Sequence, residues 1–195
     1  IFMKNNIRNN LRILITIFLF ILLSKICLGT SFVAIGHLYP VIKDDEIISR
    51  LFKKIESLNP DYIFVLGDSA LEDKETFLKF KNKFKNKIFF SPGNHEIINN
   101  SLDQYVDNVG YLNRVIETDT LKFILLNSTA NLFDIKKFLI ESLKDNSKKL
   151  NIILTHHRIW DDTLTSQAEY QNNKSFYLKD IYSIISDKIN YIFAG

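Results

Sequence analysis

Short apolar runs alternate with helical patterns from Phe32 onward, and this alternation limits the fold more than any other feature of the chain. The apolar runs predict buried strands, and the stretches between them repeat apolar residues at the three- and four-residue spacing of an amphipathic helix. Such alternation is typical of α/β domains. The sequence therefore predicts an α/β fold, and 195 residues suffice for one domain with a sizeable core.

The pattern also gives approximate bounds for each element. The predicted strands cover residues 32–35, 62–66, 88–90, two arms of a hairpin within 114–127, 150–154 and 191–193. The predicted helices cover residues 45–58, about 74–83, 101–110, 131 to about 144 and 178–186. The polar, aperiodic stretch 161–175 is predicted to be a loop.

The first 29 residues differ from the rest in charge and hydropathy. Lys4, Arg8 and Arg12 precede an apolar run at 13–23, which is the pattern of a secretory signal. We expect residues 1–29 to be a signal peptide and residues 30–195 to be an exported domain, located in the periplasm, in the cell envelope or outside the cell. The alternative is an uncleaved anchor, in which case this segment makes the only membrane contact.

Charge and cysteine content exclude several classes of function. The net charge of +3 comes from four cationic residues before Thr30, so the remainder is about neutral (3 − 4 = −1) and no nucleic-acid partner is predicted. The lysines at 79–87 lie among phenylalanines at helical spacing, which indicates a solvated helix face. Cys27 is the only cysteine, which rules out an intramolecular disulfide and a thiolate metal cluster.

Polar residues with metal-binding chemistry follow four of the predicted strands. These residues are His37, Asp68, the adjacent Asn94 and His95, and His156. The carboxyl ends of strands in α/β sheets are where loops converge and ligands bind, so we expect His37, Asp68, Asn94 and His156 to face one crevice. A carboxylate, an amide oxygen and imidazoles suit a divalent transition metal.

Three ordered blocks resemble the calcineurin-like metallophosphoesterase family. They are Val65-Leu66-Gly67-Asp68, Ser91-Pro92-Gly93-Asn94-His95-Glu96 and Leu154-Thr155-His156-His157, and the resemblance runs from about Phe32 to the end of the chain. It implies a four-layer α/β/β/α sandwich and metal-dependent hydrolysis of phosphate esters by a metal-activated water. The implied cofactors are divalent ions (Mn, Fe or Zn), two in the family, and the implied partner is a phosphate-ester substrate.

The resemblance also implies roles for single residues. Asp68 would bridge two metal ions, Asn94 and His156 would bind the second ion, and His95 would assist the leaving group. His37 matches a histidine ligand of the first ion. Arg158 is expected to be a surface residue, with a phosphate contact as the alternative.

The chain departs from the family pattern in two places. Ile35 stands where an aspartate ligand of the first metal is expected, and the last residue, Gly195, matches the glycine of a final Gly-His-x-His block. We therefore expect the sandwich to be C-terminally incomplete, and the chain as given to hold at most one ion well and to have little activity.

Two other functions fit parts of the sequence, and two further residues near the third block have an expected position. Gly67-Asp68-Ser69 also resembles the nucleophile block of serine esterases, with Ser69 as the attacking group. A degenerate, non-catalytic member would act as a binding module at the cell envelope. His157 is expected to pack beside the site and not to bind metal, and Trp160 is expected to pack in the core or against a loop.

Overall fold

The structure is a computed structural model, and it describes residues 29–36, 38, 45–69, 71, 73–98, 102–145, 148–160 and 177–195. The chain divides into two units, Ile1–Thr30 and Ser31–Gly195. All the described helices and strands belong to the second unit. Residues 1–28 of the predicted signal, the predicted ligand His37 and the predicted loop at 161–175 lie outside the described residues.

Within those ranges the second unit contains seven strands and six helices. The strands are β1 (Phe32–Gly36), β2 (Tyr62–Leu66), β3 (Ile88–Ser91), β4 (Arg114–Glu117), β5 (Leu121–Leu126), β6 (Leu150–Thr155) and β7 (Tyr191–Ala194). The helices are α2 (Asp45–Leu58), α3 (Lys74–Lys83), α4 (Asn94–Ile98), α5 (Leu102–Val109), α6 (Leu132–Ser142) and α8 (Leu178–Ile185). The predicted elements are present with bounds within about two residues, but α4 was not predicted. None of the described helices is long and apolar enough to cross a membrane.

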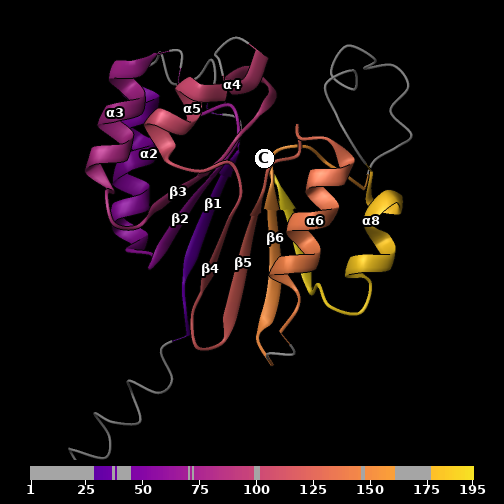
Figure 1. The fold of residues 1–195 in the computed structure, drawn as a ribbon. Coiled ribbons are helices and arrows are strands. Elements are labelled where there is room, and N and C mark those ends of the chain that lie inside the picture. Colours follow the sequence, from indigo (N-terminus) through magenta and orange to yellow (C-terminus); the bar gives the residue numbers. More distant parts are fainter. Residues whose placement is uncertain are drawn as a thin grey trace, which may run out of the picture. The chain divides into compact units, whose positions relative to one another are not determined.

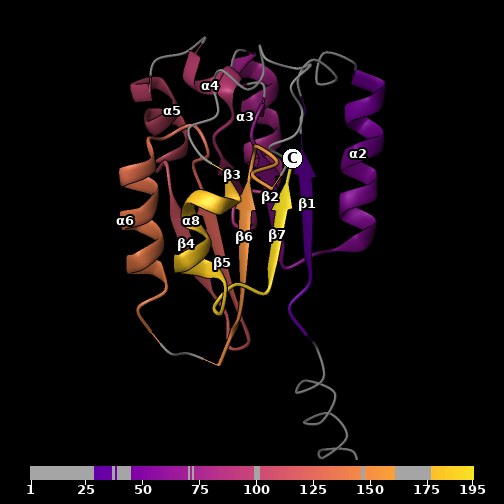
Figure 2. The same cartoon turned by 90° about the vertical axis from the view of Figure 1, so that its right-hand side faces the viewer.

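The strands form two sheets whose parallel strands end at a common edge. The first sheet has the order β1-β2-β3 and is parallel throughout. The second has the order β4-β5-β6-β7, in which only β4 is antiparallel to its neighbour. Gly36 and Ser91 are both in register with Leu66, so the carboxyl ends of the first sheet are level. Figure 2 shows β1 and β7 side by side, so one edge strand of each sheet meets the other.

Alternating side chains on each strand divide the core into three parts. In β2, Ile63 and Val65 pack with residues of the helices, whereas Phe64 and Leu66 pack against the second sheet. Helices α2, α3 and α5 cover the outer face of the first sheet, and α6 and α8 cover the outer face of the second (Figure 1). The layers run helix, sheet, sheet, helix, which confirms the predicted α/β/β/α sandwich.

Aromatic rings fill the space between the two sheets. The ring centroids of Phe64 and Phe123 are 4.7 Å apart, and those of Phe32 and Phe123 are 5.2 Å apart. Phe32 also contacts Phe193 of β7, at 5.8 Å between centroids. Tilted and edge contacts add roughly 0.5–1.5 kcal/mol per pair beyond the burial of the rings. This aromatic layer therefore holds the sheets, and the loops at their ends, in a defined relation.

The helix ends follow from local sequence signals. Asn131 accepts a hydrogen bond from the backbone N–H of Asp134 at the start of α6, at 3.0 Å. Asp73 accepts one from Thr76 at the start of α3. Asn59 ends α2 with a φ of 42°, a left-handed angle that asparagine tolerates, and Pro60 follows it.

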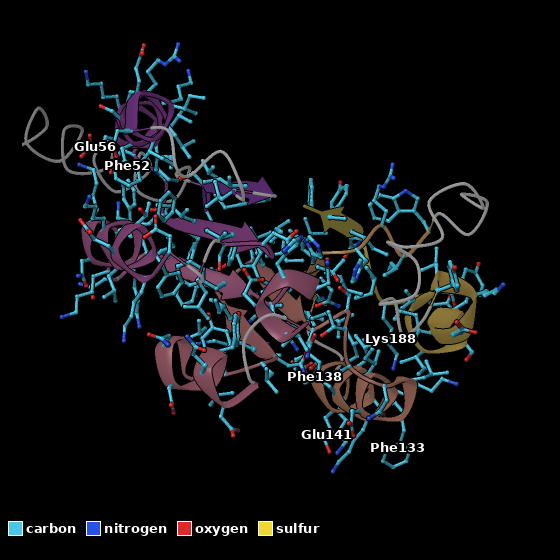
Figure 3. All side chains as sticks on the ribbon, turned by 90° about the horizontal axis from the view of Figure 1, so that it is seen from above. Phe52, Glu56, Phe133, Phe138, Glu141 and Lys188 are labelled. Carbon is cyan, nitrogen blue, oxygen red and sulfur yellow. The ribbon has the colours of Figure 1, made fainter. Side chains whose placement is uncertain are left out.

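Two lysines of the stretch 79–87 form ion pairs with glutamates on the surface of the same domain. Lys79 pairs with Glu75 at 3.0 Å, and Lys83 pairs with Glu56 at 2.7 Å. Glu56 lies on the side of α2 that faces α3 (Figure 3). These contacts agree with a solvated helix face.

Candidate metal centre

Three of the predicted ligands meet where strands from both sheets end. Asp68 follows β2, Asn94 begins α4 just after β3, and His156 follows β6. The Nε2 atom of His156 lies 2.9 Å from Oδ1 of Asn94 and 3.5 Å from Oδ2 of Asp68. All three side chains are buried. The structure thus brings these residues together, while their role as ligands stays a prediction.

The contacts of His156 determine which ring nitrogen faces the other two side chains. Nδ1 lies 3.0 Å from the carbonyl oxygen of Leu66, and because a carbonyl only accepts, Nδ1 carries the proton. Nε2 is therefore the ring nitrogen that faces the oxygens of Asn94 and Asp68. A cation bound among these three atoms would accept a lone pair from each of them. Metal-bound histidines commonly donate their second nitrogen to a backbone carbonyl in this way.

This set of donors fits a divalent transition metal. It combines a carboxylate oxygen, an amide oxygen and an imidazole nitrogen, which suits Mn, Fe or Zn. Within the described ranges, no group of three or more His, Cys, Asp and Glu side chains is placed to hold a metal, so the amide of Asn94 is needed as the third donor. Three protein donors with an open position are typical of a catalytic site.

Two glycines make the close approach of these side chains sterically feasible. Gly67 has a φ of 76°, and a Cβ on it would lie under 3.0 Å from the ring of His156. A Cβ on Gly93 would lie under 3.0 Å from Oδ1 and the backbone nitrogen of Asp68. Asp68 itself has a φ of 45°, which is an uncommon angle for a residue with a side chain. Glycine at both positions therefore lets the backbone approach the neighbouring residues closely.

Glu96 ties the turn after β2 to the turn after β3. Its Oε2 accepts hydrogen bonds from the backbone N–H groups of Asp68 at 2.8 Å and Gly93 at 2.7 Å. Its Oε1 accepts from the backbone N–H of Ser69 at 2.5 Å and from the Ser69 hydroxyl at 3.1 Å. Burial raises the pKa of Glu96, and the nearby charge of Asp68 raises it further, while the N–H of Gly93 and the N–H and hydroxyl of Ser69 lower it. Sequence reasoning gave this residue no role of its own.

His95 lies beside the three converging side chains. Its backbone N–H donates to Oδ1 of Asp68 at 3.2 Å, and its side chain is half-buried. A histidine at the border between the buried site and solvent is suited to proton transfer. Its catalytic role stays a prediction.

The residues after His156 differ in their surroundings. Nδ1 of His157 lies 2.8 Å from Oγ of Ser128, and the backbone N–H of His157 donates to the same oxygen at 3.1 Å. The rings of His156 and His157 form an edge contact, with centroids 4.8 Å apart. His157 therefore packs beside the site, as expected. Arg158 is exposed, and Trp160 is 47% exposed, so Trp160 does not pack in the core. The alternative, packing against the loop at 161–175, lies outside the described residues.

The position of the missing aspartate is apolar in its surroundings as well as in its side chain. Ile35 packs against the cluster between the first sheet and its helices. Asp45 is exposed in the first turn of α2, where it complements the helix dipole. Nothing in the described structure replaces the expected carboxylate at Ile35, and His37 lies outside the described residues.

The contacts of Ser69 disfavour a serine-esterase mechanism. Its side chain is 2% exposed, and its hydroxyl donates to Glu96. A nucleophilic serine needs a histidine base in hydrogen-bond reach and access to substrate. Ser69 is placed to hold its own loop.

Comparison with protein families agrees with this geometry. The family model for calcineurin-like phosphoesterases matches residues 41–195. The match includes Asp68, Asn94, His95 and His156, but it begins after Ile35 and His37, later than the start expected near Phe32. No curated protein sequence matches the chain.

Proposed function

Because the chain belongs to the calcineurin-like phosphoesterase family, we propose that it hydrolyses phosphate esters with the help of a divalent metal ion held by Asp68, Asn94 and His156. The observation that supports this proposal most is the approach of Nε2 of His156 to the oxygens of the other two residues. When bound there, a divalent ion supplies polarisation of the phosphoryl group and a nucleophilic water at neutral pH.

The protein's own residues hold and complement the reacting groups. Asp68 brings negative charge into a buried place, which favours a cation. The carbonyl of Leu66 holds the ring of His156 so that Nε2 faces Asp68 and Asn94. His95 is proposed to give a proton to the departing oxygen, or to stabilise its charge. Arg158 is proposed to contact the substrate phosphate through its planar guanidinium group.

Two substitutions separate metal binding from proton transfer. Asp68→Ala should abolish hydrolysis of a nitrophenyl phosphate ester and weaken Mn²⁺ binding, because it removes the charged ligand. His95→Ala should slow turnover by roughly 10²–10⁴-fold, which is typical of losing a general acid, while Mn²⁺ binding remains. The measurements are calorimetric Mn²⁺ titration and hydrolysis rates on the complete protein. Equal loss of metal in both variants would refute the assigned roles.

A second candidate function is a binding module without turnover. The apolar surroundings of Ile35 favour it, because they leave no carboxylate for a first metal ion at this position. This alternative predicts that wild-type protein binds Mn²⁺ and a phosphate ester but releases no product. Product formation that a chelator stops would exclude it.

We also propose that the domain acts outside the cytoplasm, because residues 3–29 have the charge and hydropathy pattern of a secretory signal. The measurement is the N-terminal sequence of the mature protein from its native compartment. A cytoplasmic protein that begins at Met3 would contradict the proposal.

A further inference from the structure

We infer that Glu96 is the positioning residue that sets the ligand geometry of the centre, by locking the turn after β2 onto the turn after β3. The assignment of Asp68 and Asn94 as ligands rests on the proposed function, but the contacts of Glu96 do not. Its two carboxylate oxygens accept four hydrogen bonds, and the donors lie at Asp68, Ser69 and Gly93. One ligand lies within the first turn, and the other follows Gly93 directly.

The lock is reciprocal. Glu96 of α4 accepts the backbone N–H of Asp68, and Oδ1 of Asp68 accepts the backbone N–H of His95 in α4. Each carboxylate therefore holds the backbone of the segment that carries the other one. A change in either turn must move both Asp68 and Asn94.

The backbone angle of Asp68 explains why the turn needs these hydrogen bonds. The φ of 45° at Asp68 is a left-handed angle, which is unfavourable for residues with a side chain, although aspartate tolerates it better than most. The hydrogen bonds from the backbone N–H groups to Glu96 offset that strain. Without the carboxylate, the turn has no such reason to keep the angle that directs Asp68 toward His156.

A direct role for Glu96 as a metal ligand does not fit its contacts. Its side chain is 1% exposed, and both oxygens already accept backbone N–H groups. The residue acts on the metal through Asp68 and Asn94. Loss of a group that orients a ligand typically lowers metal affinity about 10- to 100-fold.

The test compares full-chain variants by metal affinity, the visible spectrum of bound Co²⁺ and amide hydrogen exchange. In Glu96→Gln an amide N–H₂ replaces one acceptor and faces backbone donors, so Mn²⁺ affinity should fall about 10- to 100-fold. The Co²⁺ spectrum should also change. Glu96→Asp keeps the charge on a shorter side chain and should restore part of the affinity. Ser69→Ala removes only the hydroxyl contact and should have a smaller effect.

The matched control is Glu117→Gln, which neutralises a glutamate in an ion-pair network with Lys122 and Lys149, away from the centre. It should leave Mn²⁺ affinity unchanged. Wild-type affinity in a folded Glu96→Gln variant would overturn the inference, as would an equal loss of affinity in Glu117→Gln. If Glu96→Gln does not fold, Glu96→Asp provides the comparison.

Hydrogen exchange separates this inference from the proposed function. The amides of Asp68, Ser69 and Gly93 should be protected in metal-free wild-type protein and should exchange faster in Glu96→Asp. Protected amides in a protein that binds no metal would contradict the proposed function alone. Unchanged protection in Glu96→Asp would overturn the lock itself.

Discussion

Gly67 and Gly110 both have a positive φ but differ in what surrounds them. Substitutions at these two glycines therefore separate backbone strain from steric conflict. Gly67 has a φ of 76° and faces the ring of His156, whereas Gly110 has a φ of 93° with no atom within 4 Å of an added Cβ. Gly110→Ala should cost only the backbone strain, about 1–2 kcal/mol of unfolding free energy. Gly67→Ala should cost more and should also displace His156, so that Mn²⁺ affinity falls.

Urea unfolding and calorimetric Mn²⁺ titration of both variants measure the two effects. The Gly110→Ala variant should bind Mn²⁺ like the wild type, because an added Cβ at Gly110 would meet nothing within 4 Å. Unchanged affinity in a folded Gly67→Ala variant would show that the close approach at this glycine has no bearing on the centre.

The sequence predicted site residues that have metal-binding side chains and directly follow an apolar run. It did not predict residues that act through contacts between segments far apart in the sequence. Asp68, Asn94 and His156 each follow an apolar run, so their position at a sheet edge could be inferred. The contacts of Glu96 with Asp68 and Ser69 depend on how two turns meet in space, and this cannot be inferred from the pattern of apolar and polar residues. Trp160 was expected to pack in the core or against a loop, and its 47% exposure excludes only the core.

The cap of α3 provides a prediction at the scale of an element. The hydroxyl and the backbone N–H of Thr76 donate to the carboxylate of Asp73 and lower its pKa from 3.8. A lowered pKa in the folded state means that the cap stabilises the protein above the unfolded pKa, and that this contribution is lost as pH falls through the folded value. Asp73→Ala should therefore cost about 1 kcal/mol at pH 7, which is typical of an N-cap, and less at acid pH.

Urea unfolding across the acid range measures this dependence, and Asp73→Asn is the matched control. Asparagine is an equally good N-cap whose side chain does not ionise, so its stability relative to the wild type should not decline on the acid side. A cost of Asp73→Ala that is the same at pH 7 and well below 3.8 would contradict the expectation.

A helix was predictable where it is long enough for apolar residues to recur at helical spacing. The helix α2 has fourteen residues with Ile48 and Ile55 buried on one face, and its pattern is clear. The helix α4 has five residues and begins at the predicted ligand Asn94, so it is too short for a helical repeat. The partition of strands between two sheets was not read from the pattern, because both faces of β2 and β5 are apolar and alternation carries no signal there.

At the scale of the whole molecule, the centre depends on the contact between the two sheets. Asp68 and Asn94 come from the first sheet, whereas His156 comes from the second. The Ser91 hydroxyl donates to the Leu126 carbonyl at 3.2 Å and joins the ends of β3 and β5. The family resemblance predicted the four layers of the sandwich. The close approach of donor side chains from separate sheets depends on the aromatic packing between those sheets.

This dependence predicts different results for two phenylalanines with similar burial. Phe123 lies between the sheets, and Phe80 lies between the first sheet and its helices; both are at most 1% exposed. Phe123→Leu and Phe80→Leu should lower the unfolding free energy by similar amounts, within roughly the 0.5–3 kcal/mol common for single substitutions. Only Phe123→Leu should also lower Mn²⁺ affinity, because it loosens the contact that holds His156 against Asp68 and Asn94. Urea unfolding and Mn²⁺ titration of the full chain measure both quantities. Equal affinity losses at equal stability would mean that general loosening, and not the contact between the sheets, controls the centre.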